Sequence, residues 1–161
     1  MRRLAVFGTI AFTLATATVF GISSAGGSST ATTIGLYEHD TSQAKVDRGA
    51  PGESEGDMFV FAGDTFKHKG GTKVGRAAGT CTTLSTGPAG EVMCVFNFSL
   101  PGGQISTQGL SLTAAEFGGK TVSFPITGGT GAYRHARGEG TVEIPQNVPN
   151  LADANFVLRL R

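Results

Sequence analysis

The chain has 161 residues, enough for one domain, and its 13 basic and 12 acidic residues nearly cancel. A nearly neutral chain offers no electrostatic footprint for nucleic acid or for an anionic membrane surface, so we expect neither partner. Glycine is abundant at 25 residues, while charged residues make up only 16%. This composition is typical of a turn-rich β protein and argues against a helical one.

The first residues, 1–25, are predicted to be a secretory signal peptide. Two arginines give a positive start, an uncharged apolar run follows from Leu4 to Ile22, and small residues end at Ala25. This pattern predicts cleavage after Ala25 and a secreted protein with no stable membrane insertion after cleavage. The alternative is a single membrane anchor, because the run is almost long enough to span a bilayer. Residues 26–32 are small and polar and predict a flexible arm.

The remaining residues, 33–161, are predicted to form one barrel domain that begins with a strand over Ile34–Asp40. Strand alternation places Glu38 and Asp40 on the same face as two apolar side chains. Carboxylates and apolar groups seldom share a face. Either the strand leaves the core at Glu38, or a carboxylate lies inside an apolar space.

A long polar stretch over Thr41–Gly56 predicts a loop that serves as a lid or rim. Gly- and Pro-rich turns separate most of the apolar runs that follow. Eight antiparallel strands can close into a barrel, which removes exposed edges and leaves room inside for side chains or one small ligand. After the first strand, the others are expected over 57–66, 73–84, 91–100, 104–112, 121–126, 137–144 and 155–161.

The glycine-rich stretch Ile126–Gly140 joins two of these strands. Its first part holds three glycines in four positions, which allows positive φ and close approach of neighbouring chains. The residues that follow are too few for a stable free helix. We therefore expect a single helical turn between two strands, the one non-strand piece of an all-β fold.

The two cysteines, Cys81 and Cys94, form an even pair, which suggests a disulfide in an exported protein. A hairpin turn centred on Gly87-Pro88 would place them directly opposite each other on neighbouring strands, within reach of a disulfide. The alternative is two buried free thiols, which fits better if the protein is not exported.

Short motifs along the chain resemble a known family. They occur in the order seen in plant allene oxide cyclases, and the segment Gly131–Gly138 also resembles the related dirigent proteins. The resemblance covers residues 33–161, is most specific over Ile126–Gly138, and points to secreted bacterial-type members with a cysteine pair. The motifs are Leu36-Tyr37-Glu38, Val46-Asp47-Arg48 with Pro51, Asp57 with Phe59 and Phe61, Val74-Gly75, Gly79-Thr80-Cys81, Gln108-Gly109 and Ile126–Gly131.

The resemblance implies an eight-stranded antiparallel barrel with an apolar cavity. In the allene oxide cyclases this cavity folds a fatty-acid epoxide until it closes to a cyclopentenone, aided by a buried glutamate and a water. Glu38 matches that glutamate and is the expected catalytic residue, and Cys81 matches a cavity cysteine. The residues expected to bind substrate, from these matches and from strand alternation, are Asp40, Pro51, Phe59, Phe61, Phe96 and Phe98.

The departures from the family are equally informative. The side chains that hold the water in the plant enzymes correspond to Asp40, Ala50 and Gly63, and a tyrosine at the mouth corresponds to Ser111. The water-binding set is thus mostly replaced, so the plant reaction itself is not carried over. Dirigent proteins steer the coupling of phenoxy radicals, and their acidic cavity residues have no clear match in this chain.

Glu38 in an apolar barrel can act as a general acid or base, or as an anion beside a developing cation. The alternative is an ordinary rim carboxylate, solvated or paired with Arg48, Arg134 or Arg137. One function is therefore a secreted cyclase or isomerase acting on an epoxide- or polyene-type hydrophobic substrate. The other is a non-catalytic barrel that binds a hydrophobic small molecule or serves as an exported structural module.

We expect no cofactor and no metal, because the three histidines lack metal-ligand spacing and the cysteines are assigned to a disulfide. The family resemblance implies a homo-oligomer as a further expectation.

Overall fold

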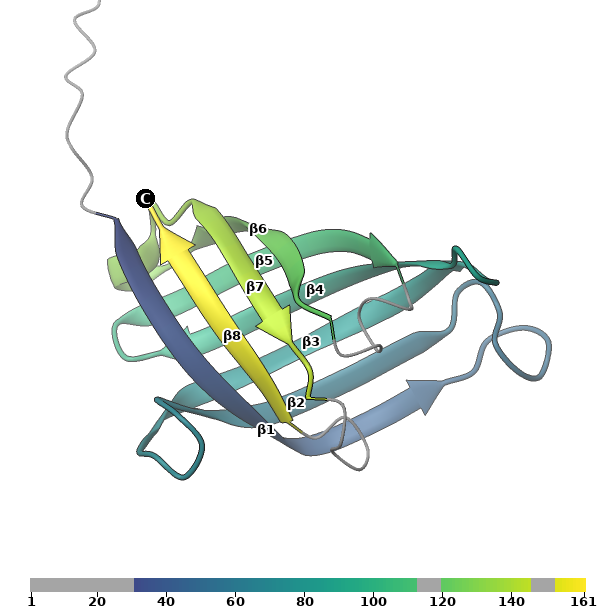
Figure 1. Cartoon of the computed structure of the whole chain (residues 1–161), viewed down its shortest axis with the longest axis horizontal. Coiled ribbons are helices and arrows are strands. Elements are labelled where there is room, and N and C mark those ends of the chain that lie inside the picture. The colour runs from purple at the N-terminus through teal and green to yellow at the C-terminus, as the bar shows by residue number, and fades with distance from the viewer. Residues whose placement is uncertain (1–30, 113–119, 146–152) are drawn as a thin grey trace, which may run out of the picture.

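The computed structural model describes residues 31–112, 120–145 and 153–161. Its eight strands close in chain order into one antiparallel barrel (Figure 1), which confirms the predicted fold class. A 3-10 turn, η1, follows the sixth strand. The strands are β1 (Thr32–Val46), β2 (Met58–Phe66), β3 (Lys73–Ser85), β4 (Glu91–Leu100), β5 (Gly103–Leu112), β6 (Val122–Gly129), β7 (Gly138–Glu143) and β8 (Asp153–Leu160).

The long first strand closes the barrel. Its first part pairs with β8, from Thr32 opposite Leu160 to His39 opposite Asp153. Its later part pairs with β2, which ends the ladder at Val46 opposite Met58. In Figure 1, β1 lies beside the yellow β8, although the two strands come from opposite ends of the chain. Each strand has two antiparallel neighbours, so no edge is left open for aggregation.

The prediction of a loop beginning at Thr41 is wrong, because β1 continues to Val46. A β-bulge between Asp40 and Ser42 shifts the register by one residue and lets the strand go on. The residues beyond the bulge are polar and mostly exposed, but their backbones still pair with β2. The polar side chains at the end of β1 therefore indicate solvent exposure and not a loop. The loop itself spans residues 47–57.

Other strand boundaries agree more closely with the sequence. β4 has the predicted bounds, whereas β6 continues beyond the expected end at Ile126 to Gly129. The predicted signal peptide and most of the predicted arm lie outside the described residues. So do the predicted connection at 113–119 and most of the loop before β8.

The turn η1 (Gly131–Tyr133) confirms the predicted helical turn in the glycine-rich stretch. Ala132 N donates to Gly102 O at 2.7 Å, and Gln104 N donates to Thr130 Oγ1 at 3.0 Å. Gly131 has a φ of +58°, and a Cβ there would collide with the Gly102 carbonyl oxygen. A glycine is therefore required for η1 to dock on the β4–β5 turn.

The end of the barrel near η1 is filled with large side chains, and we call it the packed end. Phe98, Ile105 and Leu158 are each 0% exposed there. The rings of Phe98 and Phe156 meet edge-on with centroids 5.0 Å apart. This region is a close-packed core.

Toward the opposite end, which we call the open end, the inward-facing side chains of β4 and β5 become smaller. Three neighbouring strands supply Ala77, Phe98 and Ile105 near the packed end, with Phe98 opposite both of the others. Four residues further along, the corresponding positions hold Cys81, Cys94 and Gly109. The smaller side chains leave volume inside the barrel at this end.

Candidate functional site

A cavity of about 880 Å³ occupies the open end. The end of β1, the loop 47–57 and the β3–β4 turn surround it. A volume of this size suits a small organic molecule. The lining residues are Lys45, Val46, Asp47, Gly52, Glu53, Asp57, Met58, Phe59, Cys81, Thr83, Ser85, Thr86, Gly87, Pro88, Gly90 and Val92.

Asp57 organises the rim of this cavity. Its carboxylate accepts from Arg48 N at 2.7 Å and from Ser54 N at 2.9 Å. These backbone hydrogen bonds lower the pKa of Asp57, because they favour the charged form. Two further bonds fasten the loop to β3, Gly56 N to Thr83 O and Thr83 N to Asp57 O, both 2.8 Å. The loop 47–57 is thus tied down at both ends, which sequence reasoning did not foresee.

The predicted mouth residue, Pro51, is exposed on this rim loop. It does not line the cavity, but the next two residues, Gly52 and Glu53, do. Pro51 therefore lies next to cavity-lining residues in sequence without being one of them.

The four predicted phenylalanines lie in one aromatic row that runs inward from the cavity. Phe59 lines the cavity and stacks on Phe61, with ring centroids 6.0 Å apart and planes at 25°. The ring centroids of Phe61 and Phe96 lie 5.6 Å apart. Phe96 and Phe98 are buried, at 5% and 0% exposure, so they lie behind the cavity wall.

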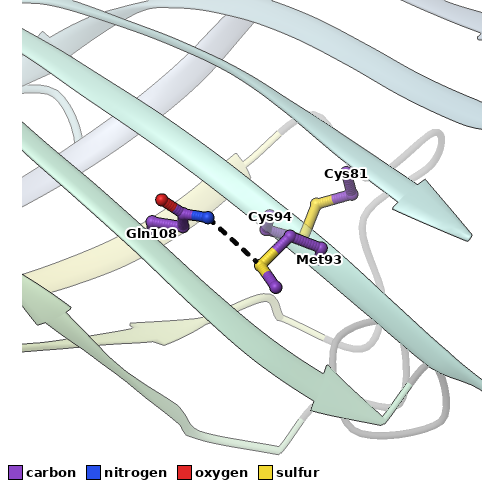
Figure 2. The surroundings of a disulfide bond; sticks show 4 residues. All are labelled: Cys81, Met93, Cys94 and Gln108. Carbon is purple, nitrogen blue, oxygen red and sulfur yellow. Dashed lines mark hydrogen bonds between the residues drawn. A yellow bond between two sulfur atoms is a disulfide. The ribbon is translucent and has the colours of Figure 1, made fainter. Parts of the chain in front are cut away.

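Cys81 and Cys94 are joined by a disulfide, with Cα atoms 4.0 Å apart. Figure 2 shows it bridging β3 and β4, with Gln108 Nε2 donating to Met93 Sδ at 3.6 Å nearby. The predicted cross-strand pairing is confirmed in this structure. Cys81 also lines the cavity, so the disulfide forms part of its wall.

Glu38 lies deeper in the barrel than the cavity. Moving inward along β1, Lys45 faces Phe59 and Gln43 faces Phe61. Asp40 and then Glu38 follow beyond the bulge, and neither lines the cavity. Glu38 is only 3% exposed, so the alternative of a solvated rim carboxylate is wrong. The conflict in the strand pattern is resolved in favour of a carboxyl group inside the barrel.

The surroundings of Glu38 favour its protonated form. Burial raises the pKa of Glu38 to about 8, assisted by the charge of Asp40 and a hydrogen bond with Asp40. Burial also raises the pKa of Asp40, against hydrogen bonds from Gln43 and Glu38 that lower it. Gln43 Nε2 donates to Asp40 Oδ2 at 2.6 Å. Glu38 is therefore the proton carrier of the pair, and Asp40 is the acceptor.

Three buried polar atoms gather at this point. Among the described residues, no hydrogen-bond partner reaches Glu38 Oε1, Asp40 Oδ1 or Thr65 Oγ1. Thr65 is 0% exposed and faces Glu38 directly across β1 and β2. Buried polar atoms nearly always have partners, so this group has unused hydrogen-bonding capacity. Sequence reasoning missed Thr65, because its position depends on a register that includes the bulge.

Next to this group, Gly63 faces Asp40. A Cβ at Gly63 would lie 2.6 Å from the His39 carbonyl oxygen and 2.9 Å from Asp40 Cα. The backbone therefore leaves no room for a side chain at position 63.

The outer side of β1 carries a separate polar cluster around Asp153. His39 Nδ1 lies 2.8 Å from Asp153 Oδ1, and Lys69 Nζ lies 3.3 Å from Asp153 Oδ2. Burial, a hydrogen bond to Asp153 and the charge of Asp153 raise the pKa of Tyr37 to about 12. Because Tyr37 and His39 are anchored outside, Glu38 between them is directed inward.

In the part of the chain that the structure describes, no three metal-ligating side chains lie close enough together to hold an ion. Within the same ranges, no helix has the length and apolar character needed to cross a membrane.

Residues 37–158 match the family described as the allene oxide cyclase barrel like domain. The match spans most of the chain, so the protein belongs to this family. No curated protein matches the sequence.

Several solved structures share the fold. A pyocyanin demethylase is 28% identical with a TM-score of 0.68, over 81% of this chain and 100% of that one. The Diels-Alderase AbmU from Streptomyces koyangensis is 23% identical with a TM-score of 0.69, over 81% of this chain and 63% of that one. A pterocarpan synthase dirigent protein is 19% identical with a TM-score of 0.64, over 81% of this chain and 84% of that one. The last two likenesses concern the fold alone.

Proposed function

We propose that this protein is a secreted barrel that binds a hydrophobic small molecule at its open end and steers the cyclisation or isomerisation of that molecule. The observation that supports this most strongly is the buried, proton-carrying Glu38 inside a barrel with an accessible cavity. An acid of this kind can protonate a substrate where bulk water does not compete.

Of the roles considered for Glu38, its raised pKa favours the general acid near neutral pH. Glu38 would give its proton to a substrate oxygen, for example an epoxide oxygen, while a carbon–oxygen bond breaks. The resulting carboxylate would take a proton back as the product forms, so the product has the same mass as the substrate. In this proposal the substrate reaches inward from the cavity to Glu38 past Phe59 and Phe61, which face the end of β1.

The similar folds are consistent with this proposal. Among them are proteins named as a Diels-Alderase and as a cyclase that catalyses a [4 + 2] cycloaddition, both of which form rings. Holding a flexible substrate in a ring-closing conformation is one way in which a protein promotes such a reaction. The same kind of control requires only a shaped apolar cavity and a few polar groups.

The second candidate is a non-catalytic barrel that binds a hydrophobic molecule or serves as an exported structural module. The loss of the water-binding side chains, including the glycine at position 63, favours this candidate. The two candidates differ in whether Glu38 changes a product or only affects binding.

A measurement of product formation distinguishes the catalytic from the non-catalytic candidate. The mature protein is incubated with epoxide and polyene fatty acids and with pyocyanin, the compound named for one structural neighbour. Chromatography with mass detection then follows new peaks, and products of unchanged mass indicate isomerisation. We expect Glu38→Gln to abolish product formation with little loss of ligand affinity, whereas Glu143→Gln, an exposed control on β7, behaves as wild type. Product formation unchanged by Glu38→Gln would contradict the catalytic role.

Export and assembly are separate parts of the proposal. Protein recovered from the culture medium should begin at Gly26, and a retained N-terminus in the membrane fraction would contradict secretion. Light scattering on a sizing column should show a homo-oligomer, as the family resemblance implies, and a monomer at high concentration would contradict it.

A further inference from the structure

Thr65 carries a buried hydroxyl that the described part of the chain does not use. The residue is 0% exposed, and no hydrogen-bond partner within the described ranges reaches its Oγ1. Thr107 is buried as well, but its Oγ1 donates to Phe96 O at 3.2 Å. A buried hydroxyl without a partner is costly, and a threonine hydroxyl can rotate to donate one hydrogen bond. Thr65 is therefore suited to an acceptor that comes from outside the chain.

This hydroxyl lies beside the acid on which the proposed function depends. Thr65 is the direct cross-strand partner of Glu38, and such partners on one face have Cβ atoms about 5 Å apart. Glu38 is only 3% exposed, and its Oε1 likewise has no partner among the residues that the structure describes. Because both side chains lie on the inner face of the barrel, one ligand atom can contact both.

The neighbouring positions on either side are small. Glu38 faces Ala154 across β1 and β8, and Thr65 faces Gly75 across β2 and β3. Neither Ala154 nor Gly75 has a side chain that can form a hydrogen bond. Across these four paired positions, the carboxyl group and the hydroxyl are thus the two polar side chains that an entering group meets.

We propose that Thr65 is the second hydrogen-bond donor to the substrate oxygen that Glu38 protonates. The inference rests on the proposed function, because it adds a residue to the same acid site. The Glu38 proton moves to that oxygen while the carbon–oxygen bond breaks. Thr65 donates a hydrogen bond to the same oxygen and keeps its own proton. Two donors on neighbouring strands fix the position of the oxygen, and with it the part of the substrate that reacts.

Two unreactive probes of the same shape test this site on the full mature chain. 2-Octanone has an oxygen that accepts hydrogen bonds, and 2-methyl-1-octene has a methylene group in its place. NMR titrations at pH 6, where Glu38 holds its proton, measure both dissociation constants. The ratio of the two constants gives the preference of the site for an oxygen, and comparing variants by this ratio cancels the hydrophobic contribution of the probes.

Matched variants locate the second donor. Thr65→Val keeps the shape of the side chain and removes the hydroxyl, so it should lower the preference for 2-octanone about fivefold, the effect of one neutral hydrogen bond. Thr65→Ala removes the same hydroxyl and should have the same effect, which covers a failure of the valine variant to fold. Thr65→Ser retains the hydroxyl and should retain the preference. Thr107→Val should also retain it, because the Thr107 hydroxyl is bonded to the backbone.

The carbonyl carbon of the bound ketone provides a second measurement that a purely structural role of Thr65 would not change. Its carbon-13 resonance moves downfield as the oxygen accepts more hydrogen bonds. We expect Thr65→Val to move the resonance of bound 2-octanone upfield. Thr65→Ser and Thr107→Val should leave it at its wild-type position.

An unchanged preference or an unchanged carbonyl resonance in Thr65→Val would overturn the inference and would mean that the hydroxyl serves only solvent. A preference lost equally in Thr65→Ser would also overturn it, because the hydroxyl would then not be the cause. In these cases both probes still bind, so the proposed function survives. If neither probe binds the wild-type protein, the proposed function and this inference fail together.

Discussion

At the packed end of the barrel, Phe98, Ile105 and Leu158 are wholly enclosed, whereas at the open end Phe59, Cys81 and a few rim residues border a cavity of about 880 Å³. The same strands pass through both regions. Part of the contrast arises from side-chain size at the inward positions of β4 and β5, which falls from phenylalanine and isoleucine to cysteine and glycine. One end of the sheet therefore supplies stability, and the other supplies the space for a ligand.

The largest expected effect comes from emptying the packed end. Phe98→Ala should lower the free energy of unfolding by about 3–5 kcal/mol, because it leaves a cavity in a fully enclosed site. Phe59→Ala at the open end should cost less than about 2 kcal/mol, because that ring already borders free volume. Urea denaturation measures both. Equal losses for the two variants would contradict the contrast between the ends.

The disulfide links β3 and β4 within the open half. Its cysteines are separated by 13 positions, and replacing both with alanine should lower the free energy of unfolding by about 3 kcal/mol. Thermal and urea unfolding measure the loss, and reduction of the wild-type protein should reproduce it. Mass analysis should find two hydrogens missing from the native protein. Two thiols that react without reduction would show that the bond is absent.

Glu38 should make stability depend on pH. Its pKa is raised from 4.5 to about 8, so the folded protein holds a proton that the unfolded chain releases. The contribution of Glu38 to the free energy of unfolding is fully present below pH 4.5. It is lost as the pH rises toward 8, and the loss exceeds about 1 kcal/mol. Glu38→Gln should flatten this part of the profile in urea titrations at stepwise pH. A wild-type protein equally stable at pH 5 and pH 8 would contradict the raised pKa.

The smallest expected effect is a difference in the free energy of unfolding between valine variants of two buried threonines. Thr107 Oγ1 donates to Phe96 O at 3.2 Å, so Thr107→Val should cost about 1 kcal/mol. Thr65 Oγ1 has no partner among the described residues, so Thr65→Val should leave stability unchanged or raise it. Urea midpoints compare the two. A clear loss for Thr65→Val would mean that its hydroxyl is already bonded.

Much of this architecture could be predicted from sequence because it depends on local signals. The turn around Gly87-Pro88 predicted that Cys81 and Cys94 face each other, and they do; Ser85 faces Glu91 beside the turn, and a bulge between Thr83 and Ser85 then brings the cysteines into register. The alternation around Glu38 left two possibilities, a strand that leaves the core or a carboxyl group in an apolar space, and the structure places the carboxyl group inside the barrel.

The remaining features depend on pairing between distant segments. Thr65 has no unusual local context, and only the bulged register of β1 and β2 places it opposite Glu38. The rim built by Asp57 depends on backbone donors from a loop whose path the sequence does not specify. The polar residues at the end of β1 predicted a loop, although pairing with β2 makes them a strand.

The protonation of Glu38 is the most direct test of the whole account. Carbon-13 NMR of protein labelled at its glutamate carboxyl groups would follow each titration, with Glu38→Gln identifying the signal of Glu38. The account predicts a midpoint near the raised pKa of about 8 for this carboxyl group, shifted by a ligand bound at the open end. A midpoint at the ordinary value of 4.5, unaffected by ligand, would show that Glu38 is neither a buried acid nor part of the site.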